Sequence, residues 1–312
     1  FFFFFAFLNT KLLLMERNRT SAIHVGSFYV WRILRIWPLY FAFVGVVSIF
    51  ELARNVNPPG YFVAHWFFVG NWYTVTLGLR NSLIEHMWSV SVEEQFYILW
   101  PLLMARLNTK HFASALVLIY AGSNMLRASL IYLSYPDSVP LWCNTFTHLD
   151  AFIVGGLLAS ALHNRDIVLS AVIRAGLFAG AFAIFWQLGH YPFAGYFSFY
   201  PLWTYPLAAF ASGMCILAAI ARRPTQSISL VPAAVSYLGK ISYGLYVFHI
   251  PAIHLARHIF GAQDLPDDST WLIRASFGAA LTFLTSVASY ELLEKPFLRM
   301  KRRFTLVKSR PE

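Results

Sequence analysis

Apolar residues fill most of the chain in long blocks, and short polar stretches rich in Arg and Lys separate these blocks. A helix needs about 20 mostly apolar residues to cross a bilayer, and the shorter blocks reach this length only with flanking residues. The pattern therefore predicts an all-α fold, a polytopic bundle of transmembrane helices. The predicted apolar segments are residues 1–15, 36–51, 62–79, 88–104, 112–133, 148–162, 168–189, 201–221, 236–260 and 271–294.

Composition supports this class and excludes several others. Hydrophobic residues make up 58% of the chain and charged residues 12%, whereas an ordinary soluble domain carries about 25% charge. This balance, with 30 Phe, 16 Tyr and 10 Trp, excludes a soluble globular enzyme, an intrinsically disordered chain and a coiled coil. No long linker and no internal repeat interrupts the pattern, so residues 1–312 are expected to form one membrane domain.

The net charge of +10 indicates membrane topology and not an affinity for nucleic acid, because most basic residues lie between apolar segments. Basic loops stay in the cytoplasm, which places the tail after residue 294 inside the cell. The loops 134–147 and 190–200 contain no Lys or Arg and are expected outside. We therefore expect a multi-pass protein whose surroundings are the lipid bilayer, with no nucleic-acid partner.

One segment breaks the alternation of inner and outer loops. If every apolar segment crossed the bilayer, the arginine-rich loop 16–35 would lie outside. The simplest repair is that segment 62–79, which contains the polar residues His65 and Asn71, enters the membrane and returns on the same side. Nine spans then remain beside this re-entrant segment. The basic residues predicted outside are Arg54, Arg80, Arg127, Arg257 and Arg274.

Two arginines in SFYVWRILRIWPLYF, residues 27–41, form the first candidate site. Arg32 and Arg35 are three residues apart and therefore share one face of a helix, just before Pro38. Two guanidinium groups on one face suit a ligand with several phosphates, such as a nucleotide or coenzyme A, because each can form paired hydrogen bonds. The alternative is that both arginines only anchor the helix at the membrane surface.

Acidic residues in HMWSVSVEEQFYILWP, residues 86–101, form the second candidate site. Placing an acidic side chain inside a span costs about 2.5–3.5 kcal/mol, so Glu93 and Glu94 are expected to face a cavity or a basic partner. Such carboxylates can orient a catalytic histidine or hold the hydroxyl group of an acceptor. A buried ion pair that only joins helices is the alternative.

The third candidate site is a polar helix face in YLGKISYGLYVFHIP, residues 237–251. Ser242, Tyr243, Tyr246 and His249 recur every three to four residues in this segment, so most of one face is polar. A histidine in a membrane helix is a functional hypothesis by default, and hydrogen bonding between helices is the alternative.

The remaining polar patterns give weaker support for a catalytic or metal site. Glu291 and Glu294 in ELLEKPF share a face near the inner end of the last span, where an interfacial role is more typical than catalysis. His148 and Asp150 can form a polar site, but two residues do not make a metal site. The sequence contains no phosphate-binding loop, nucleophile elbow, zinc-protease motif or dinucleotide fingerprint. We therefore expect no metal.

Taken together, these segments resemble acyltransferase family three, the integral-membrane acyltransferases that modify bacterial surface glycans and other extracytoplasmic or lipid-linked acceptors. The second block, a Trp-Ser before Val-Glu-Glu-Gln-Phe-Tyr and a closing Trp-Pro, is the most specific. The resemblance covers nearly the whole chain and rests on five blocks in order, FYVWRILRIWPLY, HMWSVSVEEQFYILWP, HLDAFIVGGLLA, ISYGLYVFHIP and ELLEKPF.

The resemblance implies that an acyl group, commonly acetyl, passes from acyl-CoA on the cytoplasmic side to a hydroxyl group of a glycan, a lipid-linked sugar or another extracytoplasmic acceptor. It implies a bacterial inner (plasma) membrane. By this analogy Arg32 and Arg35 contact coenzyme A. Of the adjacent Glu93 and Glu94, only one is expected to point inward. The candidate cavity or acceptor residues are Trp88, Ser89, Glu93, Glu94, Tyr97, Ser242, Tyr243 and His249.

The resemblance also implies a catalytic histidine in a first span, which we expect to be missing from this sequence. The chain begins at Phe1 inside an apolar segment, and Phe5-Ala6 stands where the family has a small Ser-Gly pair. We therefore expect an N-terminally truncated sequence in which no residue takes the role of that histidine. As given, the chain is expected to be inactive unless the native protein supplies this span.

Two other interpretations compete with an acyltransferase. A transporter or flippase without covalent chemistry also uses buried acidic residues and an interrupted membrane segment, and internal inverted repeats would favour it. We find no such repeats in the sequence. The third interpretation is a degenerate family member without activity, which a missing first span would favour.

Overall fold

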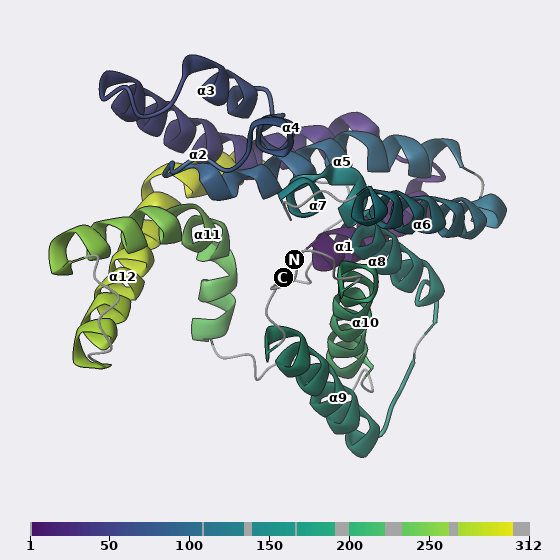
Figure 1. The fold of residues 1–312 in the computed structure, drawn as a ribbon. Coiled ribbons are helices and arrows are strands. Elements are labelled where there is room, and N and C mark those ends of the chain that lie inside the picture. Colours follow the sequence, from purple (N-terminus) through teal and green to yellow (C-terminus); the bar gives the residue numbers. More distant parts are fainter. Residues whose placement is uncertain are drawn as a thin grey trace. The chain divides into compact units, whose positions relative to one another are not determined.

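The computed structural model describes residues 2–107, 109–133, 139–165, 167–190, 200–221, 233–261 and 268–301, and every regular element in these ranges is helical (Figure 1). The all-α prediction is confirmed for this part of the chain. The predicted inner residues Arg222 and Arg223 and most of the basic tail lie outside the described residues. The elements are α1 (Phe2–Thr20), α2 (Val25–Ala53), α3 (Pro59–Trp66), α4 (Gly70–Leu77), η1 (Glu85–Met87), α5 (Trp88–Arg106), α6 (Thr109–Tyr132), α7 (Val139–Cys143), η2 (Thr145–His148), α8 (Leu149–Ala161), α9 (Ala171–His190), α10 (Tyr200–Ile220), α11 (Ala233–Phe260), α12 (Asp268–Ser289), the π-helical turn η3 (Tyr290–Glu294) and α13 (Lys295–Lys301).

Five helical stretches in the described residues are long and apolar enough to cross a membrane, and they make the chain a multi-pass membrane protein. Four other predicted spans correspond to α1, α5, α8 and α11, which do not meet the same criterion of length and composition. With 13 residues, α8 reaches only about 20 Å along its axis. The prediction of nine spans is therefore not confirmed and stays a prediction. The five stretches are Val25–Ala53, His111–Tyr132, Ala171–His190, Tyr200–Ile220 and Thr270–Met300.

The predicted re-entrant segment 62–79 is broken into two short helices, α3 and α4, of eight residues each. The break falls at residues 67–69, where Phe68 has a φ of 55°, in the left-handed region. Because a helix of eight residues extends only about 12 Å, neither piece crosses a bilayer by itself. The absence of a continuous helix here fits the expectation that this segment does not span, and its entry into the membrane stays a prediction.

The described residues form two compact units, and each unit consists of stretches that are separated in the sequence by parts of the other. The first unit contains residues up to 25 and residues 92–221, and the second contains residues 26–91 and 233–301. That all 312 residues make one acyltransferase domain stays a prediction.

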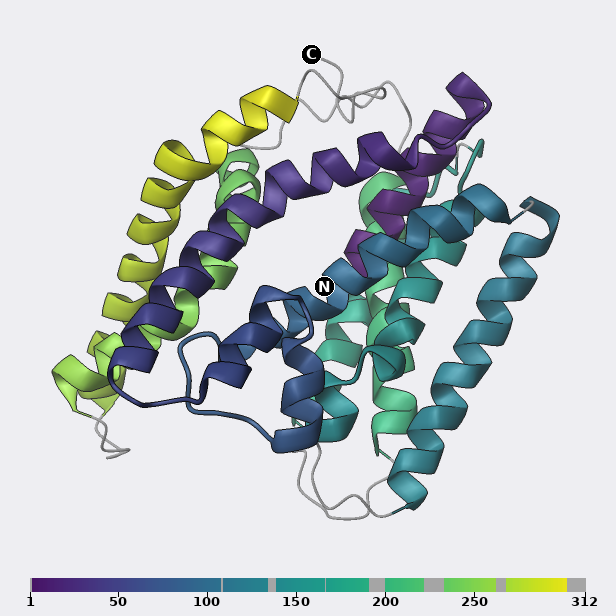
Figure 2. The same cartoon turned by 90° about the horizontal axis from the view of Figure 1, so that it is seen from above.

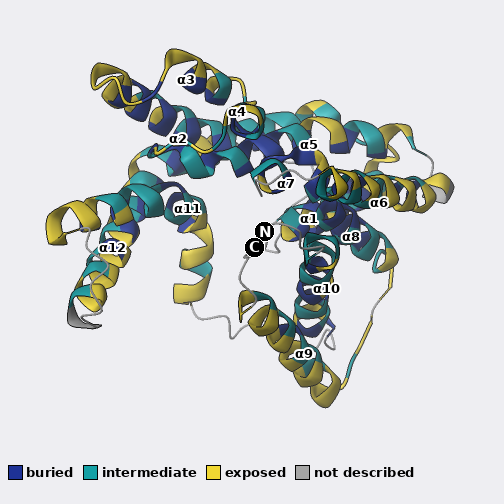
Figure 3. Cartoon of the chain, in the orientation of Figure 1, coloured by how far each residue is buried: buried dark blue, intermediate teal, exposed yellow. Residues whose placement is uncertain are grey.

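The core of the first unit lies where α1, α8 and α10 meet (Figures 1 and 3). Phe3 and Phe7 of α1 pack there with Ala159 of α8 and with Ala209 and Ile216 of α10, and all five side chains are buried. In Figure 3, α9 is mostly exposed although it lies beside α10, as expected for a helix that faces lipid.

Contact between α1 and α8 requires a glycine. A Cβ atom on Gly155 would lie 2.4 Å from the carbonyl oxygen of Phe3 and 3.1 Å from the backbone nitrogen of Phe7. Both atoms belong to the backbone of α1, so no side chain can move aside. Small residues at helix interfaces allow this kind of close approach within membranes.

We expect Gly155→Ala to lower the stability of the first unit by about 1–3 kcal/mol, the usual cost of overpacking. The measurement is the apparent melting temperature of the purified protein in detergent, followed by size-exclusion chromatography after heating. Gly122→Ala on α6 is the matched control, because a Cβ atom added to Gly122 would have nothing within 4 Å. Equal melting temperatures for the two variants would contradict the close approach of α1 and α8.

The second unit is built on α2 and on the pair of α11 and α12, which run side by side (Figure 2). Gly244 of α11 meets Ser286 of α12 so closely that a Cβ atom would lie 3.1 Å from the Cα atom of Ser286. The short helices α3 and α4 pack against each other, with His65 buried between them and α2. Tyr40 of α2 donates a hydrogen bond of 2.7 Å to the carbonyl oxygen of His65.

Candidate functional site

Arg32 and Arg35 both lie within α2, which begins at Val25 and therefore includes part of the predicted loop 16–35. Arg35 is fixed by two neighbours in the second unit. Its Nη2 atom donates a hydrogen bond of 3.1 Å to the carbonyl oxygen of Lys240, and its Nη1 atom lies 3.7 Å from the carboxylate of Glu294. The ELLEKPF segment thus contacts the first candidate site through Glu294, which is buried and ion-paired.

Arg32 is also enclosed, with 8% of its surface exposed. Its guanidinium carbon lies 4.6 Å from the ring centre of Trp31 and 5.4 Å from that of Phe28. Neither Arg32 nor Arg35 lines the two cavities described below. Contact of these arginines with coenzyme A therefore stays a prediction, and the membrane-anchoring alternative stays open.

The acidic pair of α5 differs from the expectation that only one of the two carboxylates points inward. Both Glu93 and Glu94 are buried. Neighbouring side chains on a helix differ in direction by about 100°, so both are buried where the helix is covered on more than one side. Tyr97 donates a hydrogen bond of 3.4 Å to Glu93, and its ring lies edge-on against Phe5 of α1 in the same unit.

In the second unit, Ser89 and Tyr246 form a polar cluster with His86. Trp88, half-buried, begins α5, and Ser89 in its first turn shares a short hydrogen bond with the hydroxyl group of Tyr246. Tyr246 donates its proton to the carbonyl oxygen of His86 across 2.7 Å. Ser89 also lies within hydrogen-bonding distance of that carbonyl oxygen, at 3.3 Å, so either hydroxyl group can be the donor in the short bond.

Two imidazole rings complete this cluster, with centres 4.9 Å apart. The Nδ1 atom of His249 lies 2.5 Å from the carbonyl oxygen of Tyr246, and the Nε2 atom of His86 lies 3.2 Å from that of Val247. A carbonyl oxygen only accepts hydrogen bonds, so these two nitrogen atoms carry the protons. Burial, with a contribution from His249, lowers the pKa of His86 to about 3. The Nδ1 atom of the neutral His86 ring therefore keeps its lone pair.

The remaining two residues of the polar α11 face behave differently. Ser242 is exposed, and its hydroxyl group donates a hydrogen bond of 3.1 Å to the carbonyl oxygen of Gly239 in its own helix. Tyr243 is half-buried. Helical spacing predicted one shared polar face. Of its four residues, Tyr246 and His249 are the two with described contacts to His86.

A cavity of about 590 Å³ between α11 and α12 contains His249 in its wall. Its volume lies in the range of about 300–1,000 Å³ that is typical of small-molecule sites. Most of the wall is apolar, and Arg257, Arg274 and Thr282 supply polar groups. The described lining is Leu245, His249, Ile253, Ala256, Arg257, Trp271, Arg274, Ala275, Gly278, Ala279 and Thr282.

Glu51 positions the turn that leads to His86, and sequence reasoning missed it. It is buried at the end of α2, and its carboxylate accepts hydrogen bonds from the hydroxyl group of Ser82, the backbone nitrogen of Leu83 and the side-chain amide of Asn57, all between 2.8 and 3.0 Å. An acidic residue in an apolar segment was the available signal for Glu51. His86 lies within the second motif, but its spacing alone did not select it as a site residue.

His148 and Asp150, expected to form a polar site, lie in the first unit beside Arg127. Arg127 donates to Asp150 at 2.9 Å and to the carbonyl oxygen of Thr147, and its guanidinium carbon lies 4.5 Å from the ring centre of Tyr205. The ring of His148 stacks on Tyr205 with centres 5.2 Å apart. Within the described residues, no group of three or more His, Cys, Asp or Glu side chains could hold a metal ion.

Comparison with known proteins identifies relatives over most of the chain. A family model described as an acyltransferase domain matches residues 1–291. The chain is 26% identical over 322 residues to the peptidoglycan O-acetyltransferase OatA of Listeria monocytogenes, a match that covers 95% of this chain and 50% of that protein. It is 25% identical over 327 residues to the O-acetyltransferase OatA of Staphylococcus aureus, covering 95% of this chain and 51% of the relative.

The chain therefore spans about half the length of the curated relatives it matches. A putative O-acetyltransferase of Staphylococcus aureus is similar at 23% identity over 326 residues, again across 95% of this chain. No solved structure matches the chain.

Proposed function

The chain belongs to the acyltransferase domain family, which its residues 1–291 match, and we propose that it is a membrane O-acetyltransferase acting on a glycan. The observation that carries the proposal is this match, together with similarity to proteins named as O-acetyltransferases over 95% of the chain. That the chain is an enzyme that transfers acyl groups follows from the family. Acetyl-CoA as donor, a glycan such as peptidoglycan as acceptor and a bacterial inner membrane are parts of the proposal.

In the proposed reaction, the hydroxyl oxygen of the acceptor attacks the thioester carbon of acetyl-CoA. The new ester C–O bond forms, the C–S bond breaks, and the hydroxyl proton is passed through a base to the sulfur atom that leaves as the coenzyme thiol. Arg32 and Arg35 are proposed to bind the phosphates of the donor. A guanidinium group has five N–H donors, more than the two described contacts of Arg35 use.

His249 is proposed to hold the acceptor. Its imidazole lines the cavity between α11 and α12, and in the neutral ring Nε2 is the nitrogen with a lone pair, because Nδ1 donates to the carbonyl oxygen of Tyr246. A hydroxyl group in the cavity can donate a hydrogen bond to this nitrogen. Aromatic and apolar walls with a few polar groups suit the ring faces and hydroxyl groups of a sugar.

The test supplies membranes that contain the native protein with acetyl-CoA labelled in its acetyl group. We expect label in covalent ester linkage to the glycan fraction, released by mild base. Label that crosses the membrane without becoming covalently attached would instead support the transporter or flippase alternative.

In the same assay, we expect His249→Ala to lower the transfer rate by at least about tenfold, since one hydrogen bond to the acceptor and its geometry are lost. Binding of coenzyme A, measured separately, is expected to be unchanged. His254→Ala is the matched control, because His254 lies on the same helix and is not part of the cavity wall. Equal rates for the two variants would exclude His249 from the acceptor site.

A further inference from the structure

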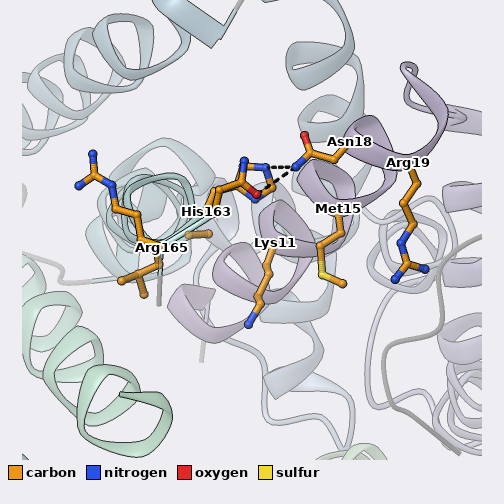
Figure 4. A pocket seen from close by; sticks show the side chains of 9 residues that line it. Lys11, Met15, Asn18, Arg19, His163 and Arg165 are labelled. Atoms are coloured by element: carbon orange, nitrogen blue, oxygen red, sulfur yellow. Dashed lines mark hydrogen bonds between the residues drawn. The ribbon is translucent and has the colours of Figure 1, made fainter. Parts of the chain in front are cut away.

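A second cavity, of about 440 Å³, opens in the first unit between the end of α1 and the residues that follow α8 (Figure 4). Figure 4 shows Lys11, Met15, Asn18 and Arg19 on α1, with His163 and Arg165 from the other segment. The acyl-transfer proposal uses none of these side chains. The described lining is Lys11, Met15, Asn18, Arg19, Ala159, Leu162, His163, Asn164 and Arg165.

Hydrogen bonds hold the two walls of this cavity together. The amide nitrogen of Asn18 lies 2.8 Å from Nε2 of His163 and donates to the side-chain oxygen of Asn164 at 3.1 Å. An amide nitrogen only donates, so Nε2 of His163 accepts and the ring is neutral in this arrangement. Partial burial lowers the pKa of His163, which favours the same neutral state. Side-chain hydrogen bonds between residues 145 positions apart, Asn18 and His163, thus hold the walls of the cavity together.

The charge of the cavity wall is of one sign. Lys11, Arg19 and Arg165 are basic, and the described lining contains no Asp or Glu. None of the three makes an ion pair with a residue in the described part of the chain. Ordinary membrane-anchoring arginines do not require a concave site, whereas basic pockets between membrane helices on the cytoplasmic side bind phosphorylated headgroups. The sequence predicts this cytoplasmic side for all three residues.

We propose that this cavity binds a phosphate ester, with Lys11, Arg19 and Arg165 as its cationic ligands. Lysine and arginine form short, charge-assisted hydrogen bonds with phosphate oxygens, and arginine can do so with two bonds at once. The phosphate comes either from the headgroup of an anionic phospholipid or from a water-soluble molecule. The inference is independent of the proposed acyl donor.

The experiment uses the purified full chain in a neutral detergent and two probes. Native mass spectrometry counts bound phosphatidylglycerol against phosphatidylcholine, and the shift in melting temperature with inorganic pyrophosphate reports a soluble phosphate. We expect Arg19→Gln/Arg165→Gln to weaken binding of the preferred probe by about tenfold or more, because two cations are removed. The control, Arg17→Gln/Arg106→Gln, removes the same charge from residues outside the cavity wall and is expected to bind within about twofold of the wild type.

Arg19→Lys/Arg165→Lys keeps both charges and is expected to retain most of the binding, which separates loss of the site from a folding defect. A preference for phosphatidylglycerol would identify a lipid headgroup, and a response to pyrophosphate alone would identify a soluble phosphate. Either result with the expected loss supports the site. The proposal is overturned if neither probe binds the wild type, or if the two glutamine variants lose binding equally.

Discussion

The Asp150→Ala variant is expected to destabilise the first unit by about 3–5 kcal/mol, a large part of the stability of a typical domain. In the structure, Asp150 lies 2.9 Å from the guanidinium group of Arg127, and both side chains are at most 1% exposed. Removing the carboxylate leaves a buried cation that keeps its desolvation cost and loses its anion. The measurement is the fraction of protein that elutes as a single species from size-exclusion chromatography after heating in detergent.

Two further variants distinguish the lost ion pair from lost packing. Asp150→Ala/Arg127→Met removes both charges, so it is expected to recover part of the stability that Asp150→Ala loses. Arg106→Ala is the control for an exposed arginine in the same unit and should melt as the wild type does. A melting temperature for Asp150→Ala that matches the wild type would mean that the buried pair adds no stability.

Most helices of this fold could be predicted, because a long apolar segment is typical of a helix whose side chains face lipid or the protein core. Boundaries were less predictable. The apolar segment 36–51 became α2 (Val25–Ala53), since the helix continues through Arg32 and Arg35, whose charges are covered by aromatic rings or matched by Glu294. Hydropathy records composition alone, so it does not detect a helix that continues through partnered charges.

The candidate site was predictable only where its residues are close in sequence. The spacing of Tyr246 and His249 placed them on one helix face, and the structure brings both into contact with His86. The contact of His86 with the backbone of Val247 links residues 161 positions apart, which no local pattern reports. Ser242 has the same spacing but is exposed, because spacing does not determine what covers a face.

The arginines predicted to lie outside are a feature of the charge pattern that the structure explains in part. The predicted topology made Arg127, Arg257 and Arg274 exceptions to the rule that basic residues stay inside. In the structure, Arg127 is the buried partner of Asp150, and the other two line the cavity with His249. For these three residues the structure shows contacts or a position in a cavity wall that the charge pattern alone did not predict.

Replacing both Arg32 and Arg35 by alanine is expected to weaken the binding of coenzyme A by about 100-fold. Each hydrogen bond to a charged group contributes about 1.5–3 kcal/mol, so loss of two such contacts costs at least about 3 kcal/mol. If the arginines only anchored α2 at the membrane surface, the affinity would not change. The measurement is the dissociation constant of coenzyme A for the purified native protein, obtained by microscale thermophoresis.

This experiment needs a background that protects the fold, because Arg35 is the ion-pair partner of the buried Glu294. Glu294→Gln removes the carboxylate that would otherwise be left unpaired, so the comparison is between Glu294→Gln alone and Arg32→Ala/Arg35→Ala/Glu294→Gln. Arg54→Ala, just beyond the end of α2, controls for the loss of an arginine near the same helix. If Glu294→Gln and Arg32→Ala/Arg35→Ala/Glu294→Gln bind coenzyme A with equal affinity, neither arginine belongs to the donor site. Their role would then be to anchor α2 at the membrane surface.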